Sequence, residues 1–193
     1  NVPSEASSRA ARWTVHSASA LFDEAWQREW SALNAAHGSV PVLECPFIIA
    51  GLESFGDGSQ RLMVATRNER VVAMAVMAPT SRLHWSTFQP SQLPLGAVVA
   101  APGEDLEVLG ADLLRSLPGA MVVSFTQLDP RFIARGVDSK VARHDDYIDT
   151  AWVDIEGDFD NYWAARGKNL RQNLRKQRNR LAADNTTFDM RTW

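Results

Sequence analysis

Seven basic residues crowd into the stretch between positions 166 and 180, and no acidic residue interrupts them. Guanidinium and ammonium groups bind phosphates and carboxylates through charge-assisted hydrogen bonds. On a helix, residues three and four positions apart lie on one face. Lys168, Arg171, Arg175 and Arg178 follow this spacing. We therefore predict a helix that presents these four side chains as a stripe, and we take them as the candidate anion- or phosphate-binding residues.

This basic stretch admits three interpretations. It is a solvated helix whose charges pair with neighbouring acids, or a phosphate-binding surface for a nucleotide, coenzyme A or a polyanionic acceptor, or a helix that binds RNA or DNA. Nucleic-acid-binding modules usually add stacking aromatic side chains, and here Tyr162 and Trp163 stand only at the start. Leu170, Leu174 and Leu181 share a neighbouring face, which predicts that one side of the helix packs on a domain.

The other reactive side chains form no recognisable catalytic or metal-binding pattern. The four histidines are scattered, and the sequence has no His-x-x-x-His pair and only one cysteine, so we expect no metal site. Cys45 lacks a basic neighbour that would activate it as a nucleophile. His84 is expected to be structural, and Asp145-Asp146 to lie at the surface. The motifs of common hydrolases, P-loop nucleotidases and Rossmann dehydrogenases are missing, and the catalytic residues remain unknown.

The overall charge hides this local excess. The 193 residues carry 20 Lys and Arg against 23 Asp and Glu, a net charge of −3; without the seven basic residues the balance is 13 against 23, or −10. No apolar run approaches the roughly 18 residues that span a bilayer, and the polar N-terminus is no secretory signal. We therefore expect a cytoplasmic protein without a membrane span. Because the chain starts at Asn1 and ends in a predicted strand, we also expect it to be a fragment.

Apolar periodicity predicts alternating helices and strands. The clearest signal is an antiparallel hairpin, with strands at 61–66 and 71–77; the second strand is apolar on both faces and should be central. A helix at about 19–37 is expected to begin at Ser19 and to bury a stripe of Phe22, Trp26, Trp30 and Leu33. Further helices are predicted at 47–55, 104–117 and 159–183, and further strands at 13–15, 83–88, 121–125 (buried), 147–155 and 187–193. The fold class is α/β (α+β), with a mixed, largely antiparallel sheet flanked by helices.

The run from Phe159 to Leu181, with an aromatic start and a Lys-Asn-Leu-Arg-Gln-Asn-Leu-Arg-Lys-Gln-Arg-Asn-Arg centre, resembles the signature helix of the CelD-like proteins. These proteins are a branch of the GNAT acyltransferase superfamily that is linked to cellulose and exopolysaccharide biosynthesis. The Trp26-x-x-x-Trp30 helix and the hairpin from Leu62 to Met77 also resemble the upstream part of that family. The resemblance covers most of the chain but is concentrated in the basic run.

The resemblance implies two GNAT-like domains in tandem, an arrangement related to peptidoglycan-bridge aminoacyltransferases. Residues 1–157 would form the N-terminal GNAT-like domain, 158–185 a basic connecting helix, and 186–193 the truncated start of the catalytic domain. GNAT domains bind the pyrophosphate of acyl-coenzyme A at a helix N-terminus, through an Arg/Gln-x-x-Gly-x-Gly/Ala loop. Residues 1–193 lack that loop, so the fragment alone is expected to be inactive.

For the whole protein, the resemblance implies transfer of an acyl group from acyl-CoA, such as acetyl-CoA, to an amine or hydroxyl acceptor. Its partners would be a small-molecule acyl donor and acceptor. Two alternatives stay open. One is an aminoacyl-tRNA-dependent transferase in which the basic helix touches tRNA, and the other is a non-enzymatic module that binds a polyanion.

Overall fold

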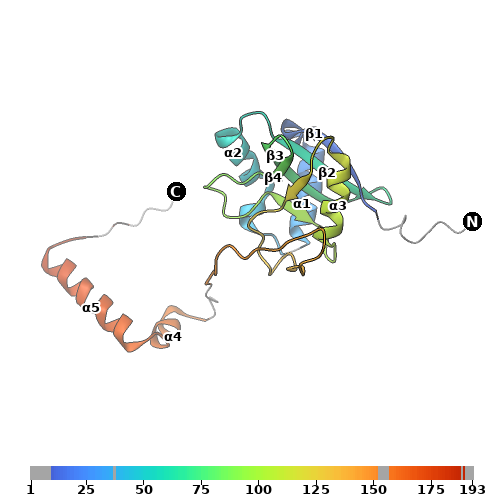
Figure 1. Ribbon diagram of the computed structural model, residues 1–193. Coiled ribbons are helices and arrows are strands. Elements are labelled where there is room, and N and C mark those ends of the chain that lie inside the picture. Colours follow the sequence, from blue (N-terminus) through green and yellow to red (C-terminus); the bar gives the residue numbers. More distant parts are fainter. Residues whose placement is uncertain (1–9, 37, 152–156, 188, 190–193) are drawn as a thin grey trace, which may run out of the picture. The chain divides into compact units, whose positions relative to one another are not determined.

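The computed structural model describes residues 10–36, 38–151, 157–187 and 189 (Figure 1). The chain divides into two compact units, Asn1–Tyr147 and Ile148–Trp193. In the described residues, the first unit contains the sheet with its flanking helices, and the second contains two helices. Each unit is described by itself below.

A six-stranded sheet organises the first unit. Its strands are β1 (Arg12–Ser17), β2 (Arg61–Arg67), β3 (Arg70–Ser81), β4 (His84–Thr87), β5 (Val98–Ala100) and β6 (Val122–Ser124). The strand order is β1-β2-β3-β4-β6, and β5 also pairs with β3. All pairings are antiparallel except that of β4 with β6, which is parallel. The predicted mixed, largely antiparallel sheet is confirmed.

Helices cover both faces of this sheet. They are η1 (Ala18–Phe22), α1 (Glu24–Ala35), η2 (Pro41–Leu43), α2 (Cys45–Phe55) and α3 (Leu106–Ser116). Alternate side chains of a strand point to opposite faces. Accordingly, Met74 and Val76 of β3 join a cluster with α1 and α2, while Ala75 and Met77 join a second cluster with α3. Because both faces are covered, β3 is apolar throughout its centre, as the sequence predicts for a central strand.

The hairpin of β2 and β3 forms as predicted. Arg67 pairs with Arg70 across a two-residue turn. Both turn residues, Asn68 and Glu69, have positive φ angles, of 50° and 62°. This left-handed pair matches the twist of the flanking strands and closes the tightest kind of hairpin.

β4 and β5 lie end to end along β3, as one strand interrupted by a loop. Thr87 of β4 lies opposite Met77, and Val98 of β5 lies opposite Ala75. The chain of residues 89–96 leaves the sheet between them and returns at Gly96. A side chain at Gly96 would clash, because a Cβ atom there would lie 2.3 Å from the carbonyl oxygen of Thr126. The glycine therefore lets the returning loop approach the segment that follows β6.

The parallel pairing of β4 and β6 requires a crossover, which α3 supplies. Asp105 caps α3, since its Oδ1 accepts a hydrogen bond from the backbone N–H of Glu107 at 2.8 Å. Leu109, Leu113 and Leu117 are buried against the sheet. The predicted helix at 104–117 is thus confirmed, with the slightly shorter bounds Leu106–Ser116.

A buried carboxylate ties the edge strand β1 to α3. Asp112 is only 6% exposed, and its Oδ2 accepts a hydrogen bond from the backbone N–H of Ala11 at 2.8 Å. Its other oxygen pairs with Arg115. The indole N–H of Trp13 donates to the carbonyl oxygen of Leu109 at 3.0 Å. These contacts fix the outer strand of the sheet to the helix that covers it.

The predicted helix at 19–37 is wrong at its start. Residues Ala18–Phe22 form a short 3₁₀ helix, and α1 begins only at Glu24. Asp23 is extended and caps α1, accepting a hydrogen bond from the backbone N–H of Ala25 at 2.7 Å. The strong capping preference of aspartate explains the break. Phe22 is consequently exposed, whereas Trp30 and Leu33 are buried as predicted.

Two predicted strands also differ. The strand expected to be buried at 121–125 is the short β6 at the edge of the sheet, where Met121 and Val122 are exposed. The expected strand at 147–155 has no strand structure in residues 147–151, and its remainder lies outside the described residues. Apart from residues 187 and 189, the predicted strand at 187–193 lies outside them too.

Candidate anion-binding surface

Two helices, not the single predicted one, lie between residues 159 and 183 of the second unit. They are α4 (Phe159–Ala164) and α5 (Lys168–Ala183). Asp158 caps α4, accepting a hydrogen bond from the backbone N–H of Asn161 at 2.7 Å. The chain leaves helical geometry at Gly167, which has an extended backbone. Glycine costs about 1 kcal/mol relative to alanine inside a helix, which makes this the natural breaking point.

The four predicted residues of the cationic stripe, Lys168, Arg171, Arg175 and Arg178, all lie on α5. At 100° per residue they fall within roughly 80° of the helix circumference and extend over about 15 Å of its length. Every residue from 167 to 180 is exposed. Among the described residues, no ion pair or hydrogen bond of these four side chains to a carboxylate is found. The helical spacing is confirmed, and the anion-binding role stays a prediction.

The positive charges of α5 destabilise the helix. Like charges three or four residues apart destabilise a helix by a few tenths of a kcal/mol per pair. The first turn has no acidic residue, and Lys168 places a positive charge at the positive end of the helix dipole. Only Arg180 stands in the last turn, where a cation is favourable. An anion bound along the stripe would relieve this repulsion.

The leucines beside the stripe are accessible within the second unit. Leu170 is 48% exposed and Leu174 is 37% exposed. No residue of α4 or α5 is buried in the described part of the unit. The predicted packing of this leucine face on a domain stays a prediction.

An aromatic cluster precedes the stripe. The rings of Phe159 and Trp163 are stacked, with centroids 5.9 Å apart and planes 11° from parallel. The guanidinium of Arg166 lies 4.3 Å from the ring centre of Tyr162, a cation–π contact. The sequence shows Tyr162 and Trp163 as aromatic residues at the start of the run, but these ring contacts were not predicted. The signal was the four-residue spacing within each pair, which brings side chains together on a helix.

The N-terminus of α3 in the first unit is another helix end that could meet an anion. It is occupied by carboxylates instead: Glu104 pairs with Arg67 at 2.6 Å, Asp105 is the cap, and Glu107 lies in the first turn. A phosphate there would face like charges, so this helix end is a poor pyrophosphate site.

His84 connects two strands of the first unit. Nε2 of His84 lies 2.8 Å from the Ser124 hydroxyl, which links β4 to β6. A serine and histidine at this distance could form a nucleophile and its base, but catalysis also needs a third group that orients the histidine. In the described residues no such group contacts His84, and no cluster of three or more metal-binding side chains occurs. The predicted structural role of His84 fits its position between the two strands.

Cys45 is a structural residue as well. It is 1% exposed at the start of α2, within the cluster formed with α1. Burial raises the pKa of the Cys45 thiol to about 11. The thiol is therefore neutral at physiological pH and is not a competent nucleophile.

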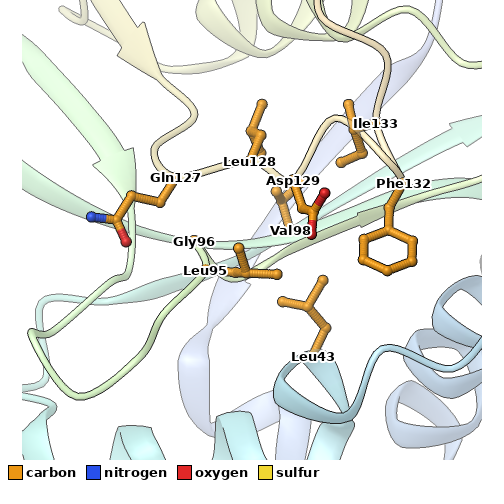
Figure 2. Close-up of a pocket in the computed structure, with 9 residues that line it drawn as sticks. All are labelled: Leu43, Leu95, Gly96, Val98, Gln127, Leu128, Asp129, Phe132 and Ile133. Carbon is orange, nitrogen blue, oxygen red and sulfur yellow. The ribbon is translucent and has the colours of Figure 1, made fainter. Parts of the chain in front are cut away.

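One hollow of the first unit is too small to enclose a cofactor, and another is open to solvent. Figure 2 shows the one near the carboxyl ends of β4 and β6, where Leu43, Leu95, Phe132 and Ile133 close in around a space of about 10 Å³. That is about the space of one water molecule. A second, open hollow of about 170 Å³ is lined by Ser17, Phe22 and neighbouring residues.

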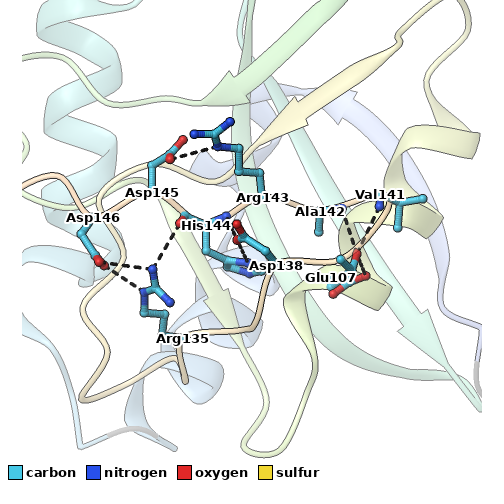
Figure 3. A network of polar contacts seen from close by, with 10 residues as sticks. Glu107, Arg135, Asp138, Val141, Ala142, Arg143, His144, Asp145 and Asp146 are labelled. Carbon is cyan, nitrogen blue, oxygen red and sulfur yellow. Dashed lines mark hydrogen bonds and ion pairs between the residues drawn. The ribbon is translucent and has the colours of Figure 1, made fainter.

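A network of polar contacts fixes the loop that follows residue 134 (Figure 3). Arg135 pairs with Asp146 at 2.9 Å, and Arg143 pairs with Asp145 at 3.1 Å. Asp138 accepts a hydrogen bond from the backbone N–H of His144 at 2.8 Å, which lowers the pKa of its carboxyl group. Asp145 and Asp146 are exposed, as predicted, and pair with arginines of their own loop.

Searches with protein-family models, among curated proteins and among solved structures returned no match for this chain. Within the described residues, no helix has the length and apolar character needed to cross a membrane.

Proposed function

We propose that this chain is the N-terminal, non-catalytic part of an acyltransferase that moves an acyl group from acyl-CoA to an amine or hydroxyl acceptor in polysaccharide or cell-envelope biosynthesis. In this proposal, α5 connects the first domain to a catalytic domain. The cationic stripe binds phosphate groups of the acyl donor or of a phosphorylated acceptor. The observation that carries the proposal is the exposed, acid-free cationic stripe on α5, in the run that resembles the CelD-like signature helix.

The chemistry of the stripe suits phosphates. Three of its four members are arginines, whose planar guanidinium groups make paired hydrogen bonds to phosphate oxygens. Arg171 and Arg175 are one helical turn apart, so together they can contact two linked phosphates. A phosphate-bearing ligand would also relieve the repulsion along the helix.

The first unit supports a non-catalytic role. The carboxylates at the N-terminus of α3 disfavour the pyrophosphate of a donor there. The buried Cys45 thiol offers no nucleophile. A thioester donor needs a binding site, a general base and a group that polarises its carbonyl. The proposal assigns these to the catalytic domain.

The test is the thermal stability of the full gene product, including any sequence after Trp193, with and without acetyl-CoA. Saturating acetyl-CoA at about 100 times its Kd should stabilise the folded protein by about 2.7 kcal/mol. Residues 1–193 alone should gain no comparable stabilisation. A melting temperature of the full product that does not respond to saturating acetyl-CoA would contradict acyl-CoA-dependent transfer.

The role of the stripe has a matched control. Arg171→Gln with Arg175→Gln should weaken binding of acetyl-CoA or of a nucleotide-diphosphate sugar about tenfold or more, because two charge-assisted contacts are lost. Arg70→Gln with Arg82→Gln removes the same charge from exposed sites of the first unit. Equal losses of affinity in both double variants would show that only net charge matters, and would contradict specific binding by the stripe.

A second candidate is a non-enzymatic module that binds a polyanion. The exposure of all six cations of α5 favours it. This function predicts binding of polyphosphate by residues 1–193, with no effect of acetyl-CoA on the stability of the full product.

A further inference from the structure

We propose that α4 and α5 together form a surface that binds RNA containing unpaired bases. This inference concerns a macromolecular partner and holds whether or not the protein transfers acyl groups. It depends on three features of the second unit: the residue types of α5, their order around the helix, and the aromatic cluster of α4.

The residue types of α5 fit a nucleic acid more closely than a simple phosphate. From Lys168 to Arg180, every residue except Leu170 and Leu174 is a cation or an amide. Cations contact the phosphate backbone and supply affinity, whereas the amides of Asn and Gln form paired hydrogen bonds with the edges of bases. The amides are Asn169, Gln172, Asn173, Gln177 and Asn179.

Their order around the helix places both functions side by side. Gln172 follows Lys168 by four residues, and Asn179 follows Arg175 by four. At 100° per residue, both amides lie within about 40° of the edge of the stripe. A strand that runs along the stripe would therefore meet base-reading amides beside the phosphate-binding cations.

The aromatic cluster supplies the stacking surface. Phe159 is 68% exposed, and its ring stacks on that of Trp163. Recognition of unpaired RNA bases commonly uses aromatic rings and arginine planes as stacking platforms. Arg166 on Tyr162 adds such a plane between the aromatic cluster and the first cation of α5.

The same features disfavour a membrane surface as the partner of α5. A helix that lies on a membrane uses a broad apolar face. In α5 the three leucines cover only roughly 40° of the circumference. Gln177 lies directly beside them, and amides fill much of the rest. The stripe is also longer than a single diphosphate requires, which favours an extended anion.

The experiment measures fluorescence anisotropy of a labelled RNA stem–loop titrated with the full chain over a series of salt concentrations. We expect saturable binding that weakens steeply with salt. Arg171→Gln, Arg175→Gln and Arg178→Gln combined should lower the affinity at least about tenfold and reduce the slope of log K against log salt by about 2. Glutamine keeps the helix propensity, and circular dichroism confirms that the fold is retained.

The matched control removes three exposed arginines from the first unit: Arg28→Gln, Arg70→Gln and Arg82→Gln. It changes the net charge equally and should leave the RNA affinity within about twofold, because these arginines are not part of the proposed surface and 0.1 M salt weakens the effect of net charge alone. An equal loss in this control would overturn the proposal.

A second variant tests the bases. Phe159→Leu with Trp163→Leu keeps apolar bulk but removes the stacking rings, and it should weaken stem–loop binding about tenfold while affecting duplex RNA less.

The proposal is overturned if the stem–loop does not bind at low salt or if this variant binds it normally. It is also overturned if duplex DNA or polyphosphate binds equally well, or if phosphatidylglycerol vesicles displace the RNA. If the full product binds RNA but acetyl-CoA does not change its thermal stability, the result would support RNA binding and contradict the proposed acyl transfer.

Discussion

The two units of the chain are stabilised in opposite ways. In the first, the central residues of β2 and β3 are fully buried between helices on both faces of the sheet. In the second, no described residue of α4 or α5 is buried. Burial of apolar surface is the main favourable term in folding. The core therefore accounts for the fold of the first unit, whereas no such core accounts for α4 and α5 in the described residues.

The ion pairs show the same contrast. Arg67, Arg115 and Arg131 of the first unit each contact a carboxylate, on Glu104, Asp112 and Asp129 respectively. The cations of α5 contact none in the described part of the chain. These three arginines of the first unit thus contribute to its fold, whereas the cations of α5 have no such carboxylate contact among the described residues.

The largest effect expected from this contrast is at Trp30. Its ring is fully buried, and its indole N–H donates to the carbonyl oxygen of Leu43 at 2.7 Å. Trp30→Ala should lower the free energy of unfolding by about 3–5 kcal/mol. Leu170→Ala, at a site 48% exposed, should change it by less than about 0.5 kcal/mol. Urea denaturation measures the change in the free energy of unfolding for each variant. Similar changes in the two variants would contradict the difference proposed between the units.

A smaller effect is expected from the Cys45 thiol at alkaline pH. Its pKa is about 11 in the folded protein, raised by burial from an ordinary value of 9.0. Between these values the unfolded chain loses the proton while the folded chain keeps it. Stability should therefore fall by about 1.4 kcal/mol per pH unit from this group and level off above the folded pKa. Below pH 9 the group should have no influence. Urea denaturation at several pH values measures this fall in stability, and Cys45→Ala is the control that should lack it. If the unchanged protein and Cys45→Ala show the same dependence of stability on pH, the prediction is wrong.

The smallest effect is expected on α5. Arg175→Glu replaces repulsion by attraction toward Arg171 and Arg178, and should stabilise the helix by about 0.5–1 kcal/mol. Arg175→Gln, which only removes repulsion, should give about half of that. Amide hydrogen exchange of the α5 backbone at low salt is the measurement, and the differences should shrink near 1 M salt. Faster exchange in the glutamate variant would mean that repulsion does not limit this helix.

Much of the fold follows from apolar patterns that local physics reinforces. The hairpin of β2 and β3 combines two apolar runs with a polar turn, and both signals agree. The helix start is a different case: Phe22 continues the apolar spacing of α1, but the cap at Asp23 interrupts the helix. The partial exposure of β6 was not predictable from its valines either. Its place at the edge of the sheet is set by the crossover through α3.

The candidate site was only partly predictable. Spacing alone places Lys168 and the three arginines on one helical face, since that depends only on the helix period. The break at Gly167 was missed because a single glycine is often tolerated within a helix. The stacking of Phe159 on Trp163 depends on ring orientation, which spacing does not specify.

The hydrogen bond from Ala11 to Asp112 has a kinetic consequence. It joins residues separated by 101 positions, and β1 also pairs with β2 across about fifty residues. Contacts between distant parts of a chain form only after a large loss of chain entropy. We therefore expect the hairpin of β2 and β3 to form early and β1 to dock last. Destabilising the bond at Asp112 should then speed unfolding while leaving the refolding rate nearly unchanged.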